Sequence, residues 1–481
     1  MAVTGLSRVE DQRLITGAGD FVADLRLPRM VEMALLRSDV PHGRLVSLDC
    51  EQARSSPGVL AAIGARDLTG VSPFPDFIEA MRPVATFPLA VDRVRYVGAP
   101  VAAVVAENRA RAEDALETVT AEYEPLEAVA TLERALADDA PRLFDGWADN
   151  RAVDVTRRDP EVARILASSR VVRASYRVHR QAPAPMETRG SVAAFAAGRL
   201  TLWTGNQSPH IVRTTLATVL GISEHAIRVV VDDVGGSFGS KTHVYPEDVL
   251  VAWLAMRLGR PVRWIEDRAE HFVASVHARD QRHVLEAAID DDGRILAVRA
   301  QITCDIGSGE VFPAGVASSF VTGGVLTGPY RIPHAEVGVT CVVTNKTPSG
   351  AYRGFGTPEA VFAMERLVER IASETGRDAI ELRREMLLER DALPYAMPSG
   401  SIIDSGSHRD CFDRAVGLGR AALAQARAQR RRRRRRGWGA ASPAIWRASA
   451  PLTSSPPDTG PRTRRARSGS SPTAAWSSRS G

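Results

Sequence analysis

The sequence predicts an α+β protein built from more than one domain. Short runs rich in β-branched residues alternate with amphipathic helical segments along most of the chain. The 481 residues exceed the length of a typical single domain. The composition, 44% hydrophobic and 25% charged, is that of an ordinary globular protein. No period of about 20–50 residues marks a repeat array, so conventional domains are expected.

The first clear elements are a strand over residues 101–105, an uninterrupted apolar run, and a helix over residues 109–123. The apolar residues of this helix share one face: Ala112, Ala115, Leu116 and Val119. After them, residues 131–158 are rich in Ala, Asp and Arg and have weak periodicity, which places a domain junction there. These elements therefore belong to an N-terminal domain over residues 1–130.

The elements that follow show the same two patterns. Strands are expected over three runs: residues 227–231, 299–306 and 337–344. Helices are expected over residues 247–258 and 360–375, since Gly259 and Gly376 provide C-terminal caps. The second helix directs one face inward: Val361, Met364, Leu367, Val368 and Ile371. A second junction is expected near residues 393–407, where Pro, Ser and Gly cluster.

The net charge of +5 is unevenly distributed. Of the 62 basic and 57 acidic residues, 13 Arg and one acid, Asp458, follow residue 429, so the rest of the chain carries a net charge of −7. From Arg430, seven consecutive arginines precede Ser-, Pro-, Ala- and Gly-rich sequence. We expect residues 430–481 to be a disordered or aberrant tail, produced by a frame slip or serving as a basic interaction segment. Nucleic-acid binding is therefore not indicated for the folded part.

The cysteines and the apolar stretches exclude several classes of protein. Cys50, Cys304, Cys341 and Cys411 are too far apart for a disulfide framework, a zinc site or local iron–sulfur ligation. No stretch reaches the roughly 18 apolar residues of a membrane span. The N-terminus has no hydrophobic core typical of a secretory signal. We therefore expect reduced thiols and a cytoplasmic protein.

The first segment that indicates chemistry is residues 229–241, VVVDDVGGSFGSK. A strand leads into a turn that contains Gly235, Gly236 and Gly239. Glycines permit positive φ and a close approach of the backbone to a ligand, and successive amides in such a turn can hold an anionic or oxo group. A tight turn at a strand end is the structural alternative.

A phosphate-binding loop is a rival interpretation of the same segment. Residues 235–242 nearly match G-x-x-x-x-G-K-[ST], with Ser240 in place of the second glycine. Two features argue against this nucleotide-binding function. Ser240 adds a Cβ where the loop requires glycine, and Pro246 lies where the phosphate-binding helix should already have begun.

The second segment is residues 347–359, TPSGAYRGFGTPE, between a predicted strand and a predicted helix. Arg353 supplies a permanent cation with planar donors, which suits an oxyanion or a phosphate-bearing cofactor. Phe355 lies between two glycines, an arrangement that exposes an aromatic face to a flat ligand. An ordinary helix start explains Thr357 and Pro358 but not the Arg-Gly-Phe-Gly series.

The GGxFGxK and AYRGFGxPE segments, in this order and about 110 residues apart, closely resemble the large subunits of the xanthine dehydrogenase/aldehyde oxidase family. Four other segments are similar to that family: residues 7–25, 91–105, 181–191 and 203–207. The resemblance covers residues 1 to about 429 and implies an α/β-hammerhead domain over residues 1–130. A first molybdopterin-binding domain would follow over residues 150–392, and a truncated second one would begin over residues 400–429.

The resemblance also implies roles for individual residues. Gln207 would hydrogen-bond near the oxo group of the molybdenum, and Gly236, Phe238 and Gly239 would lie against the metal centre. Arg353 would contact the cofactor. Phe355 would help to orient a planar substrate. The pterin dithiolene holds the metal in this family, so no protein ligand to the metal is expected.

The implied function is oxidative hydroxylation of a small molecule at molybdopterin or its cytosine dinucleotide, with a glutamate as base. Electrons would pass to [2Fe–2S] clusters and FAD. Because this chain has no local cysteine cluster, an iron–sulfur subunit and an FAD subunit would carry those groups. The base of the family lies in a Gly-x-Gly-Glu-type segment near the C-terminus of a considerably longer chain, and no segment of this sequence is expected to match it. A non-catalytic fragment is therefore the alternative.

Two positions bear on the substrate. AYRGFG differs from the Cys-bearing loop of the carbon monoxide-oxidising group of the family. Thr242 follows Lys241 where xanthine-oxidising members carry Glu. An aldehyde or an N-heterocycle is thus expected rather than carbon monoxide or a purine.

Other chemically suggestive residues receive structural interpretations. His271, His277 and His283 recur every six residues, which fits neither one helical face nor a metal-binding pattern, so surface or strand positions are expected. Glu247 and Asp248 suit the N-terminus of the predicted helix over residues 247–258 and need no catalytic role.

Overall fold

The computed structural model describes residues 8–76, 78–313 and 315–435. Contacts group the chain up to Arg420 into one compact unit, and residues from Ala421 onward into a second. The described part of the second unit is the end of helix α12 (His408–Arg435). No helix within the described residues is long and apolar enough to cross a membrane.

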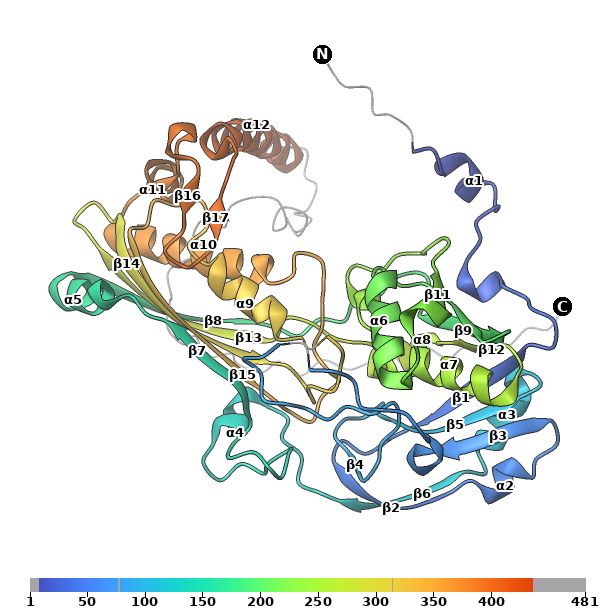
Figure 1. The fold of residues 1–481 in the computed structure, drawn as a ribbon. Helices are drawn as coiled ribbons and strands as arrows, with labels where there is room; N and C mark the ends of the chain where they lie inside the picture. Colours follow the sequence, from blue (N-terminus) through green and yellow to red (C-terminus); the bar gives the residue numbers. More distant parts are fainter. Residues whose placement is uncertain (1–7, 77, 314, 436–481) are drawn as a thin grey trace, which may run out of the picture. The chain divides into compact units, whose positions relative to one another are not determined.

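The first unit contains a seven-stranded sheet that joins segments far apart in the chain (Figure 1). Its order is β11 (Ile227–Val230), β10 (Arg199–Thr204), β9 (Gly190–Ala196), β12 (Val262–Ile265), β1 (Val31–Arg37), β5 (Pro100–Ala106) and β3 (Val59–Gly64). The central strand β12 pairs in parallel with β1, Val262 opposite Val31. The sheet is therefore continuous across the predicted boundary between the N-terminal and the following domain.

Helices cover this sheet where its strands are most apolar. Helix α6 (Pro209–Leu220) packs on β11, α7 (Pro246–Leu258) packs on β9, β10 and β12, and α3 (Arg109–Leu116) packs on β1 and β5. Strand β5 is buried at every position, as the apolar run predicted. The core between α6, α7 and the sheet is aliphatic, with Leu200, Leu202, Leu216, Leu250 and Leu254 almost completely buried. This packing gives the segments after β10 and β11 a rigid base.

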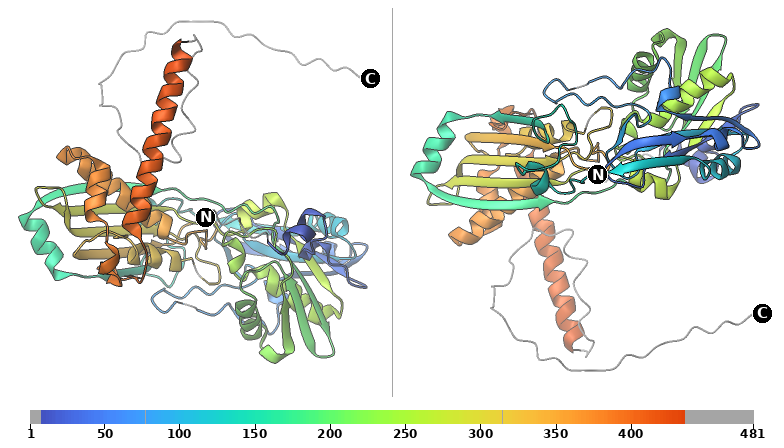
Figure 2. Two further views of the ribbon diagram at one scale, coloured as in Figure 1. Left: turned by 90° about the horizontal axis from the view of Figure 1, so that it is seen from above. Right: turned by 90° about the horizontal axis from the view of Figure 1, so that it is seen from below.

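A five-stranded sheet carries the second large core. Its order is β7 (Arg151–Arg157), β15 (His334–Val342), β14 (Ile295–Asp305), β13 (Gln281–Ile289) and β8 (Arg170–Val178). Helices α9 (Ala317–Gly324) and α10 (Thr357–Thr375) lie on one face, and α4 (Leu132–Leu136) contacts β14 and β15 (Figure 2). Cys304 and Cys341 are direct partners in the β14–β15 register, and both are buried free thiols.

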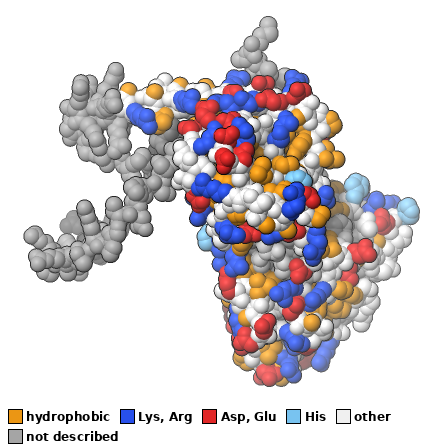
Figure 3. All heavy atoms as spheres, turned by 90° about the vertical axis from the view of Figure 1, so that its left-hand side faces the viewer, with side chains coloured by type: hydrophobic (Ala, Val, Ile, Leu, Met, Phe, Trp, Pro, Cys, Tyr) orange, Lys and Arg blue, Asp and Glu red, His pale blue; other side chains and the backbone are white. Residues whose placement is uncertain are grey.

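Smaller elements complete the described part of the chain. A three-stranded sheet has the order β4 (Arg93–Val94), β2 (Gly43–Asp49) and β6 (Thr120–Pro125), and β16 (Tyr395–Ala396) pairs with β17 (Ile402–Ile403). The remaining helices are α1 (Asp11–Ile15), α2 (Glu51–Arg54), α5 (Pro160–Ser168), α8 (Arg268–Ala274) and α11 (Ala379–Met386). On the face in Figure 3 acidic and basic side chains are interspersed, in keeping with exposed pairs such as Arg377 with Glu385.

The predicted helices over residues 247–258 and 360–375 are confirmed as α7 and α10. Each ends at a glycine in the left-handed conformation, Gly259 with φ 60° and Gly376 with φ 71°. Glycine occupies this conformation without a Cβ clash, which is why the sequence located both ends. The prediction of which residues of α10 face inward is wrong at one position. Val361 is 49% exposed, whereas Ala360 and Met364 are buried.

Two other expectations are wrong. The helix predicted over residues 109–123 ends at Leu116, and Thr120–Pro125 forms β6, which pairs with β2. Pairing with a distant strand outweighed the local helical pattern around Thr120 and Tyr123, residues that favour strands. Helix α12 continues to Arg435, past the predicted start of the tail at residue 430, since arginine is a good helix former. Residues 436–481 lie outside the described residues.

Candidate cofactor site

The Gly-rich turn after β11 has an unusual backbone. Gly236, Phe238 and Gly239 all have positive φ, at 96°, 57° and 107°. A phenylalanine rarely adopts such a conformation, and strained residues of this kind cluster at ligand sites. A Cβ on Gly239 would lie 2.8 Å from the carbonyl oxygen of Ala351. The turn therefore requires glycine there to meet the second motif.

A buried ion pair holds this turn from behind. Lys241 is 2% exposed, and its Nζ lies 2.6 Å from Oε2 of Glu187. The same Glu187 oxygen accepts a hydrogen bond of 2.7 Å from the backbone N–H of Gly235. Burial lowers the pKa of Lys241, and Glu187 partly offsets this effect. The lysine thus stabilises the turn from within the protein.

These contacts also explain why the segment is not a phosphate-binding loop. Residues Ser240–Thr242 form a single short 3-10 turn, and helix α7 begins only at Pro246. A phosphate-binding lysine would point to the ligand at the start of a helix, whereas Lys241 is paired inside the protein. The sequence-based rejection of that function therefore agrees with the geometry.

Gln207, after strand β10, lies directly beside the turn. Its backbone N–H donates to the carbonyl of Lys241 at 2.8 Å. Its side-chain Oε1 accepts hydrogen bonds from the hydroxyls of Ser237 and Thr242, the latter at 3.0 Å. Because these two donors occupy the oxygen, the amide NH₂ of this exposed residue is left as the group that can donate to a ligand.

The second motif is attached to the first through its backbone. The N–H of Arg353 donates to the carbonyl of Phe238 at 2.7 Å. Phe355 also has a positive φ, 46°. The Arg353 side chain is exposed, and its guanidinium has no hydrogen-bond or ion-pair partner among the described residues. Arg279 supports the motif, since it donates to the carbonyl of Arg353 at 3.1 Å and pairs with Glu359 at 2.9 Å.

The structure therefore brings together the six predicted site residues in one exposed region: Gln207, Gly236, Phe238, Gly239, Arg353 and Phe355. The rings of Phe238 and Phe355 are 45% and 38% exposed. An amide donor, a Gly-rich turn, an unpaired cation and two exposed aromatic rings can bind a planar, anionic ligand. No group of His, Cys, Asp or Glu suited to holding a metal ion occurs within the described part of the chain.

His243 is a site-building residue that the sequence analysis missed. Its Nε2 accepts a hydrogen bond from the backbone N–H of Ala351 at 2.9 Å, and its Nδ1 lies 3.0 Å from the carbonyl of Pro313. This requires the neutral tautomer with the proton on Nδ1. Burial lowers the pKa of His243 to about 4. The ring thus joins the two motifs, but no motif in the sequence marks it.

A buried ionic cluster lies behind the site. Arg189 pairs with Glu247 at 2.9 Å and Glu266 at 2.6 Å, and Arg37 on β1 also contacts Glu247. Burial opposes ionisation of Glu247, but Arg189 and Arg37 outweigh it and hold its pKa below the usual value. Asp248 accepts the N–H of Tyr245 at 3.0 Å, so its predicted helix-start position is confirmed. Glu247 instead joins the cluster, which sequence spacing did not reveal.

The three histidines occupy different environments. His271 lies in α8, is buried and contacts both Glu266 and the carbonyl of Pro183 at 2.8 Å, so the expected surface or strand position is wrong. His283 lies on β13, as a strand position, and is buried. His277 forms an isolated backbone β-bridge with Ser349. Burial lowers the pKa of His277 and of His283 to about 4. Helix α8 was not predicted, which explains the error at His271.

A Gly-x-Gly-Glu string does occur at residues 307–310, far from the C-terminus. Its Glu310 lies 2.8 Å from Arg95. Burial raises the pKa of Glu310, although Arg95 partly offsets this. No described contact joins Glu310 to Gln207 or Arg353. The string therefore does not place a carboxylate in the candidate site.

Comparison with known families gives two matches. Residues 144–387 match the molybdopterin cofactor-binding domain. Residues 16–127 match the a/b hammerhead domain of aldehyde oxidase and xanthine dehydrogenase. The first match contains every residue of the candidate site.

Individual relatives agree with these matches. The chain is 37% identical over 415 residues to the 6-hydroxypseudooxynicotine dehydrogenase complex subunit gamma of Paenarthrobacter nicotinovorans, covering 84% of this chain and 52% of that protein. It is 33% identical over 425 residues to the carbon monoxide dehydrogenase large chain of Afipia carboxidovorans, covering 83% and 52%. The chain thus spans about half the length of these curated relatives.

A solved structure has a similar fold. Quinoline 2-oxidoreductase from Pseudomonas putida 86 superimposes with a TM-score of 0.84 and 38% identity. The match covers 89% of this chain and 56% of that one.

Proposed function

Because the chain belongs to the aldehyde oxidase and xanthine dehydrogenase family and contains its molybdopterin cofactor-binding domain, we propose that it serves as the molybdopterin-binding part of a molybdenum hydroxylase large subunit. The observation that carries this proposal is one hydrogen bond, from the N–H of Arg353 to the carbonyl of Phe238, which joins the two motifs. The motifs lie about 110 residues apart in the sequence. The side chain of Gln207 accepts a hydrogen bond from Thr242, at the end of the same turn.

The residues present fit a molybdopterin group. The turn at Gly236 and Gly239 has a positive-φ backbone whose amides can hold an anionic or oxo group, and the unpaired guanidinium of Arg353 can bind the phosphate of the cofactor. When bound, the cofactor supplies the redox-active metal that accepts two electrons from the substrate. The amide NH₂ of Gln207 would donate to an oxygen at the metal end, because Ser237 and Thr242 hold the side-chain oxygen.

The aromatic residues determine how a substrate lies. Phe238 and Phe355 are exposed at the site, and their positive-φ backbones set the direction in which each side chain leaves the main chain. Exposed aromatic rings can orient a flat heteroaromatic ring by stacking or by edge contacts. We infer an N-heteroaromatic substrate, with an aldehyde as the second choice. The names of two relatives, which contain hydroxypseudooxynicotine and quinoline, favour the first class.

The partners follow from what this chain cannot hold. Among the described cysteines, Cys50, Cys304 and Cys341 are buried and Cys411 is isolated, so they form no iron–sulfur site. We propose that a [2Fe–2S] subunit and an FAD subunit receive the electrons, in the cytoplasm. Relatives are named as a complex subunit and as a large chain, which supports an assembly of several subunits. We also propose that residues 400–429 begin a second molybdopterin-binding domain.

A second candidate function is cofactor binding without turnover by this chain alone. The observation that favours it is the pairing of Glu310 with Arg95, which leaves residues 307–310 unable to supply the expected base. The alternative of a nucleotide-binding loop is not proposed, because Lys241 is paired with Glu187.

The cofactor proposal is tested by loading. The full chain is produced in a host that makes molybdopterin, and molybdenum and the pterin released by oxidation are quantified. We expect both in the folded wild-type chain and a loss of at least about tenfold, near 1.4 kcal/mol of binding, in Arg353→Glu. Arg390→Glu, at another exposed arginine, should load normally. A folded wild-type chain without pterin would refute the proposal.

The substrate proposal is tested on the assembled complex with an artificial electron acceptor. Rates with quinoline, benzaldehyde and xanthine separate the three classes. We expect quinoline to react fastest and xanthine not to react. A loaded complex that prefers xanthine would contradict the substrate class but leave the cofactor assignment intact. A loaded chain that is inactive alone and active in the complex supports cofactor binding without turnover by the chain alone.

A further inference from the structure

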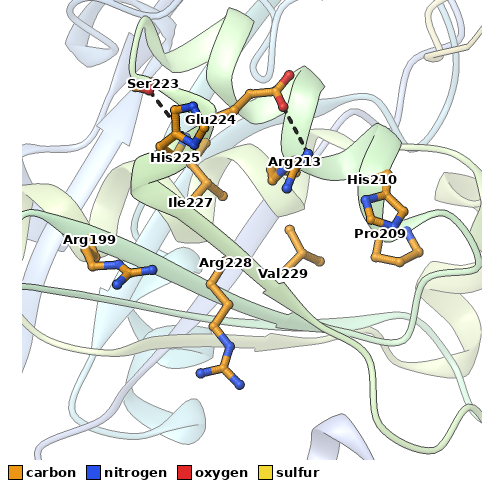
Figure 4. Close-up of a pocket in the computed structure, with 10 residues that line it drawn as sticks. All are labelled: Arg199, Pro209, His210, Arg213, Ser223, Glu224, His225, Ile227, Arg228 and Val229. Carbon is orange, nitrogen blue, oxygen red and sulfur yellow. Dashed lines mark hydrogen bonds and ion pairs between the residues drawn. The ribbon is translucent and has the colours of Figure 1, made fainter.

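A groove of about 720 Å³ runs along strand β11, at the edge of the seven-stranded sheet (Figure 4). It is lined by residues from the start of β10, from α6, from the turn before β11 and from β11 itself. They are Arg199, Pro209, His210, Arg213, Ser223, Glu224, His225, Ile227, Arg228 and Val229. None of them belongs to the candidate cofactor site, so this groove needs its own explanation.

The groove follows an open strand edge. Within the described residues β11 pairs only with β10, in parallel, with Leu200 opposite Ile227 and Trp203 opposite Val230. In a strand paired on one side, alternate backbone N–H and C=O groups point to the open side. Four residues give an edge of about 13 Å, enough for a short added strand. Such an edge favours an extended polypeptide as the occupant.

The groove carries unpaired positive charge on one face of the strand. Arg213 on α6 pairs with Glu224 at 3.2 Å, which neutralises one positive charge. Arg199 and Arg228 are exposed and have no carboxylate partner among the described residues. Figure 4 shows Arg228 pointing away from Val229 and from α6, while Arg213 lies on the α6 side. An added strand would therefore meet unpaired positive charge on the face that carries Arg199 and Arg228.

Two further features set the polarity of the ligand. Helix α6 begins at Pro209 beside the groove, and the N-terminus of a 12-residue helix adds positive potential. Asp232 and Asp233 follow the C-terminal end of β11, away from Arg199 and Arg228, and Asp233 is already paired with Arg13. Acidic side chains of a ligand should therefore face the half of the strand near Arg199 and Arg228. Charge complementarity thus selects an acidic occupant.

We propose that the edge of β11 binds an extended acidic segment of a partner polypeptide, which pairs with the strand and places carboxylates beside Arg199 and Arg228. Backbone pairing supplies affinity, and the arginines supply the preference for acidic sequence. The proposal does not depend on molybdenum chemistry, because it uses no residue of the cofactor site.

The test measures binding of a fluorescein-labelled peptide, Glu-Val-Glu-Val-Glu-Val-Glu, to the full chain by anisotropy. We expect the double variant Arg199→Glu/Arg228→Glu to weaken binding at least about tenfold. The matched control is Arg66→Glu, at an exposed arginine beside β3, the opposite edge of the same sheet. The arginines of residues 430–436 are present in every variant, so only the difference between variants counts.

Two further peptides and one ion distinguish strand pairing from simple charge attraction. A peptide with Lys in place of Glu should not bind. A peptide of the same charge with proline at its centre should bind at least about fivefold more weakly, because proline removes a donor and disrupts pairing. Equal binding of the proline peptide, together with displacement by inorganic phosphate, would identify a simple anion site and overturn the proposal. Equal losses in the Arg66→Glu control would also overturn it.

Discussion

Replacing His243 with asparagine tests the junction between the two motifs. In the wild type the imidazole is buried and neutral, and it accepts the N–H of Ala351 while its Nδ1 side contacts the carbonyl of Pro313. Asparagine can still donate to Pro313, but it leaves the Ala351 N–H without an acceptor. A buried unsatisfied donor costs about 1–3 kcal/mol, so His243→Asn should be roughly 2 kcal/mol less stable at pH 7.

The pH dependence provides a second, independent magnitude. Burial lowers the pKa of His243 to about 4 from its ordinary value of 6.5, so the unfolded chain binds this proton more readily than the folded one. The stabilisation is therefore fully present above pH 6.5 and is lost as the pH falls towards 4, about 3 kcal/mol in all. By pH 5 about 2 kcal/mol of it should be gone.

The two effects together predict converging curves. His243→Asn should be less stable than the wild type at pH 7 and nearly equal to it at pH 5. Urea unfolding followed by tryptophan fluorescence measures the difference in stability between the two proteins from pH 7 to pH 5. The contributions of the partly buried His277 and the buried His283 are the same in both proteins and cancel in this difference. His179→Asn, at an exposed histidine, is the control and should follow the wild type. Parallel curves for wild type and His243→Asn would refute the buried neutral imidazole.

Three other substitutions test the packing around the site. Gly221→Ala should lower the free energy of unfolding by about 1 kcal/mol, because this residue has a positive φ. Gly239→Ala should lower it further, because Gly239 also has a positive φ and in addition lies against Ala351. Equal shifts in melting temperature for the two variants would contradict the close approach. Lys241→Met should lower the free energy of unfolding in urea by about 3–5 kcal/mol, because it leaves the Glu187 carboxylate without its partner. The double variant with Glu187→Leu should regain part of that stability, since it removes this carboxylate. Additive effects of the two substitutions would argue against the ion pair. Met364→Ala should cost about 2–5 kcal/mol and Val361→Ala under about 1 kcal/mol, since only Met364 is buried on α10; the reverse order in thermal unfolding would show that the α10 register is wrong.

Local features of the sequence located several elements accurately. Gly259 and Gly376 marked the ends of α7 and α10, because a left-handed C-cap depends on the residue at that one position. The apolar run at residues 101–105 identified β5 for a similar reason, since a strand buried on both faces has no polar positions. The strand over residues 227–231 was also found, as β11.

Non-local pairing caused the errors in the fold. Residues 120–123 carry a helical pattern but form part of β6, because they pair with β2. The two strands are about 70 residues apart in the sequence, and local propensity does not register a partner at that separation. The continuous seven-stranded sheet was missed for the same reason. Its central pairing joins Val31 to Val262, and no local pattern in either strand indicates the other.

The candidate site divides in the same way. The sequence alone supplied the residue types and their order: a Gly-rich turn at Gly236 and Gly239, then Arg353 in a second motif, and these were enough to indicate a family and its chemistry. Only the tertiary structure decided which atoms meet. His243 accepting the N–H of Ala351, and Lys241 pairing with Glu187, each join segments distant in the chain. Such contacts depend on how sheets and helices pack, because burial and hydrogen-bond geometry are properties of the folded chain and not of its local sequence.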